Sequence, residues 1–331
     1  MSKLRLSVAI GDYDRNRPLI DGRVGIDGVD PVFMTLSPEE IFFRAFRHQE
    51  FDICEVSFSS YVVSIDKGNP AYIAIPAFLS RAFRHSSILI RNDKGIESPA
   101  DLKGKRIGLA EYQLTANVWT RGLLEDEYGV KPSDVTWVRG GMEAAGRPEK
   151  IKLDLPSEIT IESASDGRSL NDLLKSGEID AYIGPRTLSC FDQGHPKVER
   201  LFTDSISAAS DFYQRTSIFP IMHLLGVRRS IAEQHPWLPA ALFKAFSQSK
   251  KDALTHLGDT SATKVTLPFI EEHLANARAL LGDDFWPYGA GGANRKVLEN
   301  FLDHHHKQGL SSRRITVEEL FHPATLESVS I

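Results

Sequence analysis

The chain has 331 residues, which is long for one hydrophobic core and predicts two domains of ordinary size. Hydrophobic residues make up 41% and charged residues 25%, as in an average globular protein, and the formal net charge is -5. A nucleic-acid surface would need an excess of basic residues, so the charge argues against such a partner and favours a small molecule.

No segment marks the chain for export or for a membrane. The N-terminal sequence has neither the long apolar region nor the small-residue cleavage site of a signal peptide. No run approaches the roughly 18 apolar residues needed to span a bilayer. We therefore expect a cytoplasmic protein with no membrane partner.

The two cysteines, Cys54 and Cys190, are far apart and flanked by apolar residues. This placement predicts reduced, buried thiols rather than a disulfide, and a catalytic cysteine is the weaker alternative.

Strands alternate with helices in the first part of the chain. Apolar runs predict strands at 4–10, 29–35, 51–56 and 71–78, and residues 37–40 have the Ser-Pro-Glu-Glu sequence of a helix start. Continuous apolar strands between helices are typical of a parallel sheet covered on both faces. The pattern therefore predicts an α/β fold.

The segment 106–128 predicts a strand, a polar turn and a helix, which Gly129 ends. A helix start exposes free N–H groups and the positive end of the helix dipole. Gln113, Thr115 and backbone amides could therefore hold a carboxylate there. The alternative is an ordinary connection between a strand and a helix, with no binding role.

The chain is expected to leave the first lobe and return to it. Residues 217–227 are long enough to run from one lobe into the other, and most of the sequence after them is helical. The predicted domains are 1–92 for the first part of lobe 1, 93–212 for lobe 2, and 213–331 for the helical return of lobe 1. Three histidines at 304–306 fall in a charged helix and are interpreted as solvated surface.

Polar residues collect where the predicted parallel strands end, and open parallel sheets bind ligands at this edge. The candidates for substrate binding are Asp12, Tyr13, Arg15, Ser57, Ser59, Arg81, Arg84, Tyr112, Gln113, Thr115 and Arg186. Arginine pairs with both oxygens of a carboxylate, so this set favours a substrate with one or two carboxylates. A single arginine is more often a surface residue, and only the cluster carries the argument.

Three residues are candidates for catalysis: His85, His223 and Glu55. The unperturbed pKa of histidine suits proton transfer near neutrality. His223 lies in an apolar stretch, where a histidine is often structural, so His85 is the stronger candidate. The sequence contains none of the common motifs for zinc, for nucleotides or for a serine nucleophile. We therefore expect no metal and no cofactor.

Four segments together are similar to the 4,5-dihydroxyphthalate decarboxylases. They are FDICEVSFSSY at 51–61, AIPAFLSRAFRHS at 74–86, GLAEYQLTANVWTRG at 108–122 and WPYG at 286–289. The resemblance extends over nearly the whole chain. It implies a type 2 periplasmic-binding-protein-like clamshell, used as a cytoplasmic enzyme, with a mostly parallel sheet flanked by helices in each lobe and the substrate held between the lobes. It gives no catalytic role residue by residue.

The reaction implied by this resemblance is the non-oxidative conversion of 4,5-dihydroxyphthalate to protocatechuate and CO2 in aromatic catabolism. Each carboxyl group of that substrate has a para hydroxyl, whose deprotonation feeds electrons to the carbon that must be protonated. We assign the carboxylates to Arg81 and Arg84 with the helix end at Thr115, proton donation to His85, and the catechol hydroxyls to Glu55 or His223.

Two other functions share the expected fold. A solute-binding receptor for a small carboxylate is the main alternative, and the missing export signal counts against it. Another clamshell enzyme acting on a different cyclic carboxylate is the second. The sequence leaves a homo-oligomer open.

Overall fold

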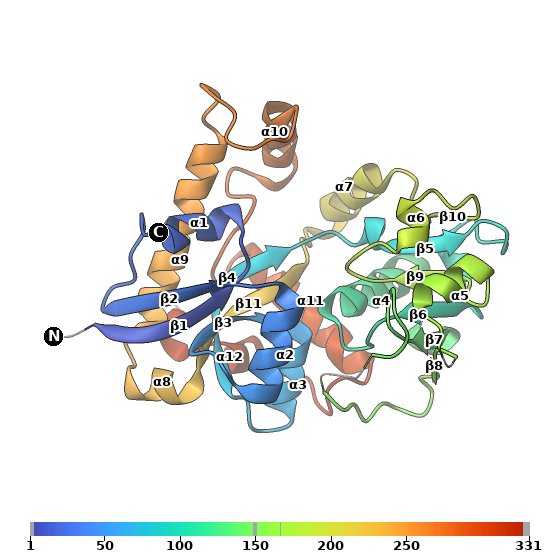
Figure 1. Ribbon diagram of the computed structural model, residues 1–331, viewed down its shortest axis with the longest axis horizontal. Helices are drawn as coiled ribbons and strands as arrows, with labels where there is room; N and C mark the ends of the chain where they lie inside the picture. Colours follow the sequence, from blue (N-terminus) through green and yellow to red (C-terminus); the bar gives the residue numbers. More distant parts are fainter. Residues whose placement is uncertain (1–2, 148–150, 166, 327–331) are drawn as a thin grey trace. The chain divides into compact units, whose positions relative to one another are not determined.

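The structure, a computed structural model, describes residues 3–147, 151–165 and 167–326. The chain forms two compact units (Figure 1). Unit 1 contains the residues up to Arg81, Ile221–Glu299 and the residues from Ile315 onward. Unit 2 contains Ala82–Pro220 and Asn300–Arg314.

The core of unit 1 is a five-stranded sheet. In spatial order its strands are β2 (Val29–Thr35), β1 (Leu4–Ile10), β3 (Ile53–Ser57), β11 (Ile221–Arg228) and β4 (Tyr72–Arg81). β1 runs parallel to β2 and β3, whereas β11 runs antiparallel to both β3 and β4. β11 is therefore the one reversed strand among the described strands of this sheet. The four others end at the same edge.

Helices flank this sheet. Those with most of their length in unit 1 are α1 (Arg17–Ile20), α2 (Pro38–His48), α3 (Phe58–Asp66), α8 (Arg229–Gln234), α9 (Leu238–Leu257), α10 (Ile270–Leu281) and α12 (Val317–Leu320). α2 and α3 pack against β3, and α9 packs against β4. The Ser37 side chain accepts a hydrogen bond from the Glu40 amide and caps α2, so the helix start predicted there is confirmed.

Unit 2 contains a six-stranded sheet. In spatial order its strands are β10 (Val198–Arg200), β5 (Ile88–Arg91), β9 (Ala181–Ile183), β6 (Arg106–Leu109), β7 (Thr136–Arg139) and β8 (Ile161–Ser163). β5 is antiparallel to its neighbours β9 and β10, and the remaining pairs are parallel. Both sheets are thus mostly parallel, with a single reversed strand among the strands described.

The helices that lie wholly within unit 2, among the described residues, are α4 (Thr115–Tyr128), α5 (Leu170–Ser176), α6 (Ser189–Asp192) and α7 (Ser205–Thr216). β6, the following turn and α4 form the strand, turn and helix that the sequence predicts. Gly129 ends α4 with a φ of 66°, a conformation that glycine adopts without steric cost. Ser169 and Asp172 form a capping box at the start of α5, whose leucines pack into the core of this unit.

The units divide at other positions than the sequence pattern suggests. Unit 2 begins at Ala82, because β5 pairs with β9 and β10. It extends to Pro220 and therefore includes α7. The expected boundaries after residues 92 and 212 both fall inside unit 2. The helix α11 (Ala293–Lys307) begins in unit 1 and ends in unit 2.

The interpretation of residues 304–306 as solvated surface is wrong for two of the three histidines. His304 and His305 are buried in unit 2. His304 Nε2 lies 2.9 Å from an Asp126 carboxylate oxygen, and His305 Nδ1 lies 3.1 Å from the Ser311 hydroxyl. Only His306 is exposed.

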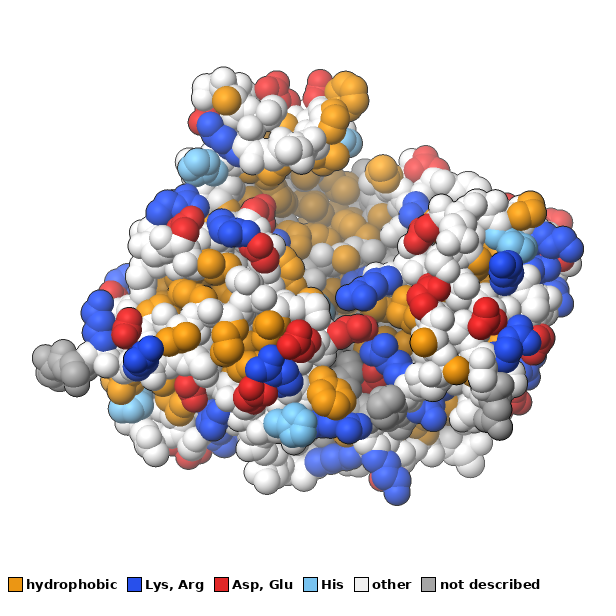
Figure 2. Space-filling view, viewed as in Figure 1, with side chains coloured by type: hydrophobic (Ala, Val, Ile, Leu, Met, Phe, Trp, Pro, Cys, Tyr) orange, Lys and Arg blue, Asp and Glu red, His pale blue; other side chains and the backbone are white. Residues whose placement is uncertain are grey.

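The two cysteines are free and buried, as the sequence predicts. Among the described helices, none combines the length and the apolar character that crossing a bilayer requires. Positive and negative side chains alternate on the described part of the face drawn in Figure 2, so that face presents no uniformly basic surface.

Candidate active site

A buried carboxylate lies in unit 1 at the edge where its parallel strands end. Glu55, near the end of β3, is fully buried. It accepts hydrogen bonds from the Gly11 amide at 3.1 Å and from the Tyr13 hydroxyl at 3.0 Å. Its Oε1 also lies 2.5 Å from His223 Nδ1. Three donors thus surround one carboxylate that water does not reach.

The topology of the sheet brings these residues together. β1 and β3 are parallel neighbours, so the loop after β1 and the end of β3 share one edge. β11 runs the other way, and its beginning therefore reaches the same edge, with His223 opposite Ser57. A Cβ at Gly11 would lie 2.2 Å from the Tyr13 ring, so only glycine lets that ring fold back toward Glu55.

His223 has one ring nitrogen held and the other open. Nδ1 contacts Glu55, and the ring packs edge-on against Phe42 with a centroid distance of 4.8 Å. The side chain is 19% exposed. Nε2 makes no hydrogen bond within the described parts of the chain, and it is not among the buried unpaired atoms. An imidazole fixed at Nδ1 and accessible at Nε2 can exchange a proton with a ligand.

Tyr13 remains a hydrogen-bond donor in this cluster. Burial raises the pKa of Tyr13 far above its ordinary value, and the charge and hydrogen bond of Glu55 raise it further, against the opposing effect of Arg15. The phenol therefore stays protonated and donates to Glu55.

Two predicted arginines contribute to the framework of unit 1. Arg15 Nε donates to the Leu79 carbonyl at 2.9 Å, and its guanidinium lies 4.5 Å from the centre of the Trp286 ring. Arg81 is buried and donates to the Pro287 carbonyl at 2.8 Å and to the Asn294 side chain. These contacts hold Arg81 against the loop before α11, so its assignment to a substrate carboxylate loses its basis.

The geometry does not favour His85 as the proton donor. His85 is buried in unit 2, between the rings of Phe202 and Phe212 at 5.2 and 5.4 Å. Burial, and to a lesser extent the charge of Arg215, lower the pKa of His85 to about 4. The imidazole is therefore neutral near pH 7 and holds no proton to give as an imidazolium.

In the turn before α4, the Glu111 carboxylate already has partners within the protein. Gln113 Nε2 donates to the buried Glu111 carboxylate at 2.9 Å, and Arg147 Nε donates to the same carboxylate at 2.9 Å. Tyr112 is fully buried, with the Arg121 guanidinium 3.7 Å from its ring centre and its hydroxyl bonded to the Gln308 carbonyl. These contacts give no support to Tyr112 as a substrate-binding residue, and the Gln113 amide already holds a carboxylate of the protein.

The remaining candidates are distributed over both units. Ser57 ends β3 and Ser59 lies in the first turn of α3, both buried, while Thr115 begins α4 and is also buried. Asp12 is exposed and pairs with Arg17.

In unit 2, Arg84 and Arg186 line one cavity of about 630 Å³, and Arg200 joins them. The sequence missed Arg200 because β10 has only three residues, too few for a periodic pattern. Within the described residues, no group of three or more His, Cys, Asp or Glu side chains could hold a metal ion.

Comparison with known proteins gives both the fold and close relatives. A family model described as "ABC transporter, phosphonate, periplasmic substrate-binding protein" matches residues 25–145. The periplasmic aliphatic sulphonate binding protein SsuA from Escherichia coli aligns with a TM-score of 0.54 at 14% identity, covering 100% of this chain and 96% of that one. The α/β class and the periplasmic-binding-protein-like fold predicted from the sequence are thereby confirmed.

Two curated proteins are much more similar in sequence. The 4,5-dihydroxyphthalate decarboxylase of Comamonas testosteroni is 63% identical over 331 residues, which is 100% of both chains. The 4,5-dihydroxyphthalate decarboxylase of Pseudomonas putida is 63% identical over 217 residues, 66% of this chain and 84% of that protein.

Proposed function

The chain belongs to the 4,5-dihydroxyphthalate decarboxylase family, and we propose that Glu55 and His223 handle the phenolic proton in its reaction. The enzyme is a carboxy-lyase that converts 4,5-dihydroxyphthalate to protocatechuate and CO2. The observation that carries the proposed roles is the 2.5 Å contact between the buried Glu55 carboxylate and Nδ1 of a histidine whose Nε2 is accessible.

The substrate itself supplies the electrons for this reaction. A base removes the proton of the hydroxyl para to one carboxylate, and the phenolate pushes electron density onto the ring carbon that carries this carboxylate. That carbon takes up a proton, the bond to the carboxylate breaks, and its electron pair restores the aromatic ring as CO2 leaves. One proton replaces one CO2, so no electron acceptor takes part.

His223 has the features of the base in this scheme. Its Nε2 accepts the phenolic proton while Nδ1–H donates to Glu55. The buried carboxylate then stabilises the imidazolium that forms, as an aligned carboxylate does for a catalytic histidine in other enzymes. Tyr13 and the Gly11 amide hold the Glu55 carboxylate in the orientation that this requires.

The test is incubation of the purified protein with 4,5-dihydroxyphthalate, with chromatography of the products and measurement of CO2. We expect one protocatechuate and one CO2 for each substrate consumed, without a requirement for oxygen. In D2O, deuterium should appear at the ring position that CO2 leaves. Phthalate without hydroxyl groups should bind but not react, because nothing then feeds electrons to the ring carbon. Equal turnover of phthalate would refute the phenol-driven scheme.

We also propose that the two units correspond to the two expected lobes, and that the enzyme works in the cytoplasm on a small aromatic dicarboxylate. Cell fractionation against a periplasmic marker enzyme checks the location, and recovery of the protein with that marker would contradict it.

A further inference from the structure

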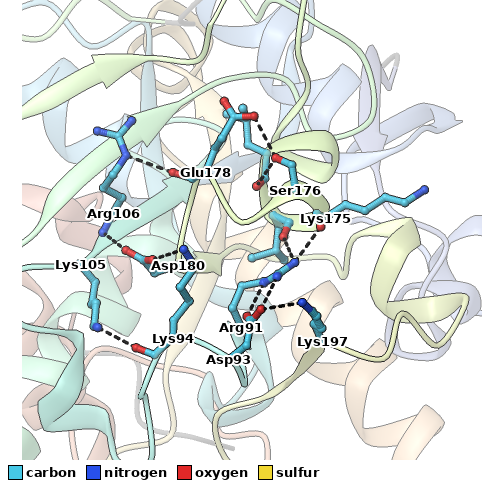
Figure 3. Close-up of polar contacts among 12 residues, drawn as sticks. Arg91, Asp93, Lys94, Lys105, Arg106, Lys175, Ser176, Glu178, Asp180 and Lys197 are labelled. Carbon is cyan, nitrogen blue, oxygen red and sulfur yellow. Dashed lines mark hydrogen bonds and ion pairs between the residues drawn. The ribbon is translucent and has the colours of Figure 1, made fainter.

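The arginines of unit 2 differ in the partners that surround them. At the edge where the parallel strands begin, the cations have acidic or carbonyl partners, several of which Figure 3 draws. Arg91 donates to both oxygens of Asp93, and Lys197 lies 3.1 Å from the same carboxylate. Arg106 pairs with Glu162 at 2.7 Å. This edge is neutralised by the protein itself.

The opposite edge, where β9 and β10 end and β5 begins, contains the cavity of about 630 Å³. This volume lies within the roughly 300–1,000 Å³ typical of small-molecule sites. Arg84, Arg186 and Arg200 line it, and Asp192 is the one acidic residue among the lining residues. The Thr187 hydroxyl donates to that carboxylate at 3.0 Å.

Two of the three arginines have no acidic partner. Arg84 and Arg200 form no ion pair with any described residue, and the Nε of each is buried without a hydrogen bond. Burial lowers the pKa of Arg84 to about 10. A guanidinium is still charged at neutral pH under these conditions. A desolvated cation such as Arg84 is costly to keep without a counter-charge, unless an anion pairs with it.

We propose that this cavity is a binding site for an aromatic carboxylate, with Arg84 and Arg200 as its anchors. The guanidinium fork pairs with both oxygens of a carboxylate, and Phe83, Leu89 and Pro185 supply apolar lining for a ring. The proposal goes beyond the assigned proton transfer, because it concerns a ligand site in unit 2 that does not depend on Glu55 or His223.

The experiment measures the binding of unreactive phthalate to the full-length protein by calorimetry. Arg84→Gln and Arg200→Gln should each weaken phthalate binding by about ten- to a hundredfold, the usual effect of losing a hydrogen bond to a charged group. Arg106→Gln, which removes an exposed arginine from the opposite edge, should leave the affinity unchanged. Arg200→Lys retains the charge without the fork and should fall between the native protein and Arg200→Gln.

Inorganic phosphate, titrated in parallel, separates an aromatic carboxylate site from a general oxyanion site. Tighter binding of phosphate than of phthalate would overturn the proposal, as would equal affinity for phthalate in all four variants. Thermal unfolding of each variant identifies a loss of affinity that comes from misfolding. If a glutamine variant misfolds, the affinity of Arg200→Lys for phthalate tests the proposal instead, and an affinity equal to that of the native protein would overturn it.

Decarboxylation is measured separately, so the two proposals fail independently. A protein that turns over 4,5-dihydroxyphthalate while its arginine variants bind phthalate normally refutes the cavity site alone. A protein that binds phthalate through Arg200 and releases no CO2 refutes the proposed function alone.

Discussion

The substitution His223→Asn separates proton transfer from structure at the candidate active site. An asparagine amide can occupy the position of the imidazole Nδ1–H and donate to Glu55, so the buried carboxylate keeps its three donors. The side chain can no longer accept a proton at the place of Nε2. We therefore expect kcat for 4,5-dihydroxyphthalate to fall by about 100- to 10,000-fold, the usual range for loss of a general base.

The free energy of unfolding should change little in His223→Asn, because no buried group loses its partner. His223→Ala, in contrast, removes one of the three donors to Glu55. It should destabilise the protein by about 1.5–3 kcal/mol, the typical contribution of a hydrogen bond to a charged group. Steady-state release of CO2 and urea unfolding measure the two effects.

His273→Asn is the matched control, since His273 is exposed on α10. It should retain full activity and stability. If His223→Asn keeps more than about a tenth of the native kcat, far above the range for a lost general base, His223 is not the base. If His273→Asn loses as much activity as His223→Asn, the effect does not belong to the site.

Three further predictions concern unit 2 and the thiols. The folded protein keeps His85 neutral down to about pH 4, whereas the unfolded chain binds this proton below about 6.5; the free energy of unfolding should therefore rise by up to about 3 kcal/mol between these pH values, and His85→Gln should remove this part of the slope. Arg121→Lys should destabilise unit 2 by about 1.5–3 kcal/mol in urea unfolding, because lysine cannot reach both Gln308 and the Tyr112 carbonyl; an unchanged midpoint would contradict this. Cys54 and Cys190 should react with a thiol reagent only after unfolding, since both are buried and burial raises the pKa of Cys54; rapid labelling of the native protein would show that a thiol is accessible.

The sequence predicts local structure well because local signals determine it. Apolar runs mark the strands, Ser37 and Gly129 mark helix ends, and the alternation of the two element types indicates a parallel sheet. The similarity of four segments to one family adds the activity. The signals for strands and helix ends depend on neighbouring residues, and the family resemblance depends on whole segments. Neither kind of signal requires knowledge of contacts between residues that are distant in the sequence.

The site depends on contacts that sequence patterns do not contain. The sequence predicts that residues 217–227 run from one lobe into the other, but not that β11 inserts antiparallel between β3 and β4 and brings His223 beside Glu55, 168 residues away. The same reason explains why the sequence favours His85 over His223 as a catalytic residue. The rings that bury His85 belong to Phe212 of α7 and to Phe202, which precedes α7, and both are distant from His85 in the sequence. A polar residue at a strand end can face a cavity, or it can face the core, as Tyr112 does. The periodicity of the sequence does not distinguish these two cases.

The return of α11 to unit 2 has a consequence for protein synthesis. The buried Arg121 guanidinium bonds to Gln308, which is 187 residues further along the chain. At about 5–20 residues per second, a ribosome makes Gln308 some 10–40 s after Arg121. A nascent chain that already contains the whole sheet of unit 2 must therefore wait with the Arg121 guanidinium lacking its Gln308 partner and with the Trp119 ring of α4, which packs against Phe301 of α11, uncovered. Such chains are the ones that chaperones protect, and a codon change that slows translation between these two residues should lower the yield of folded enzyme.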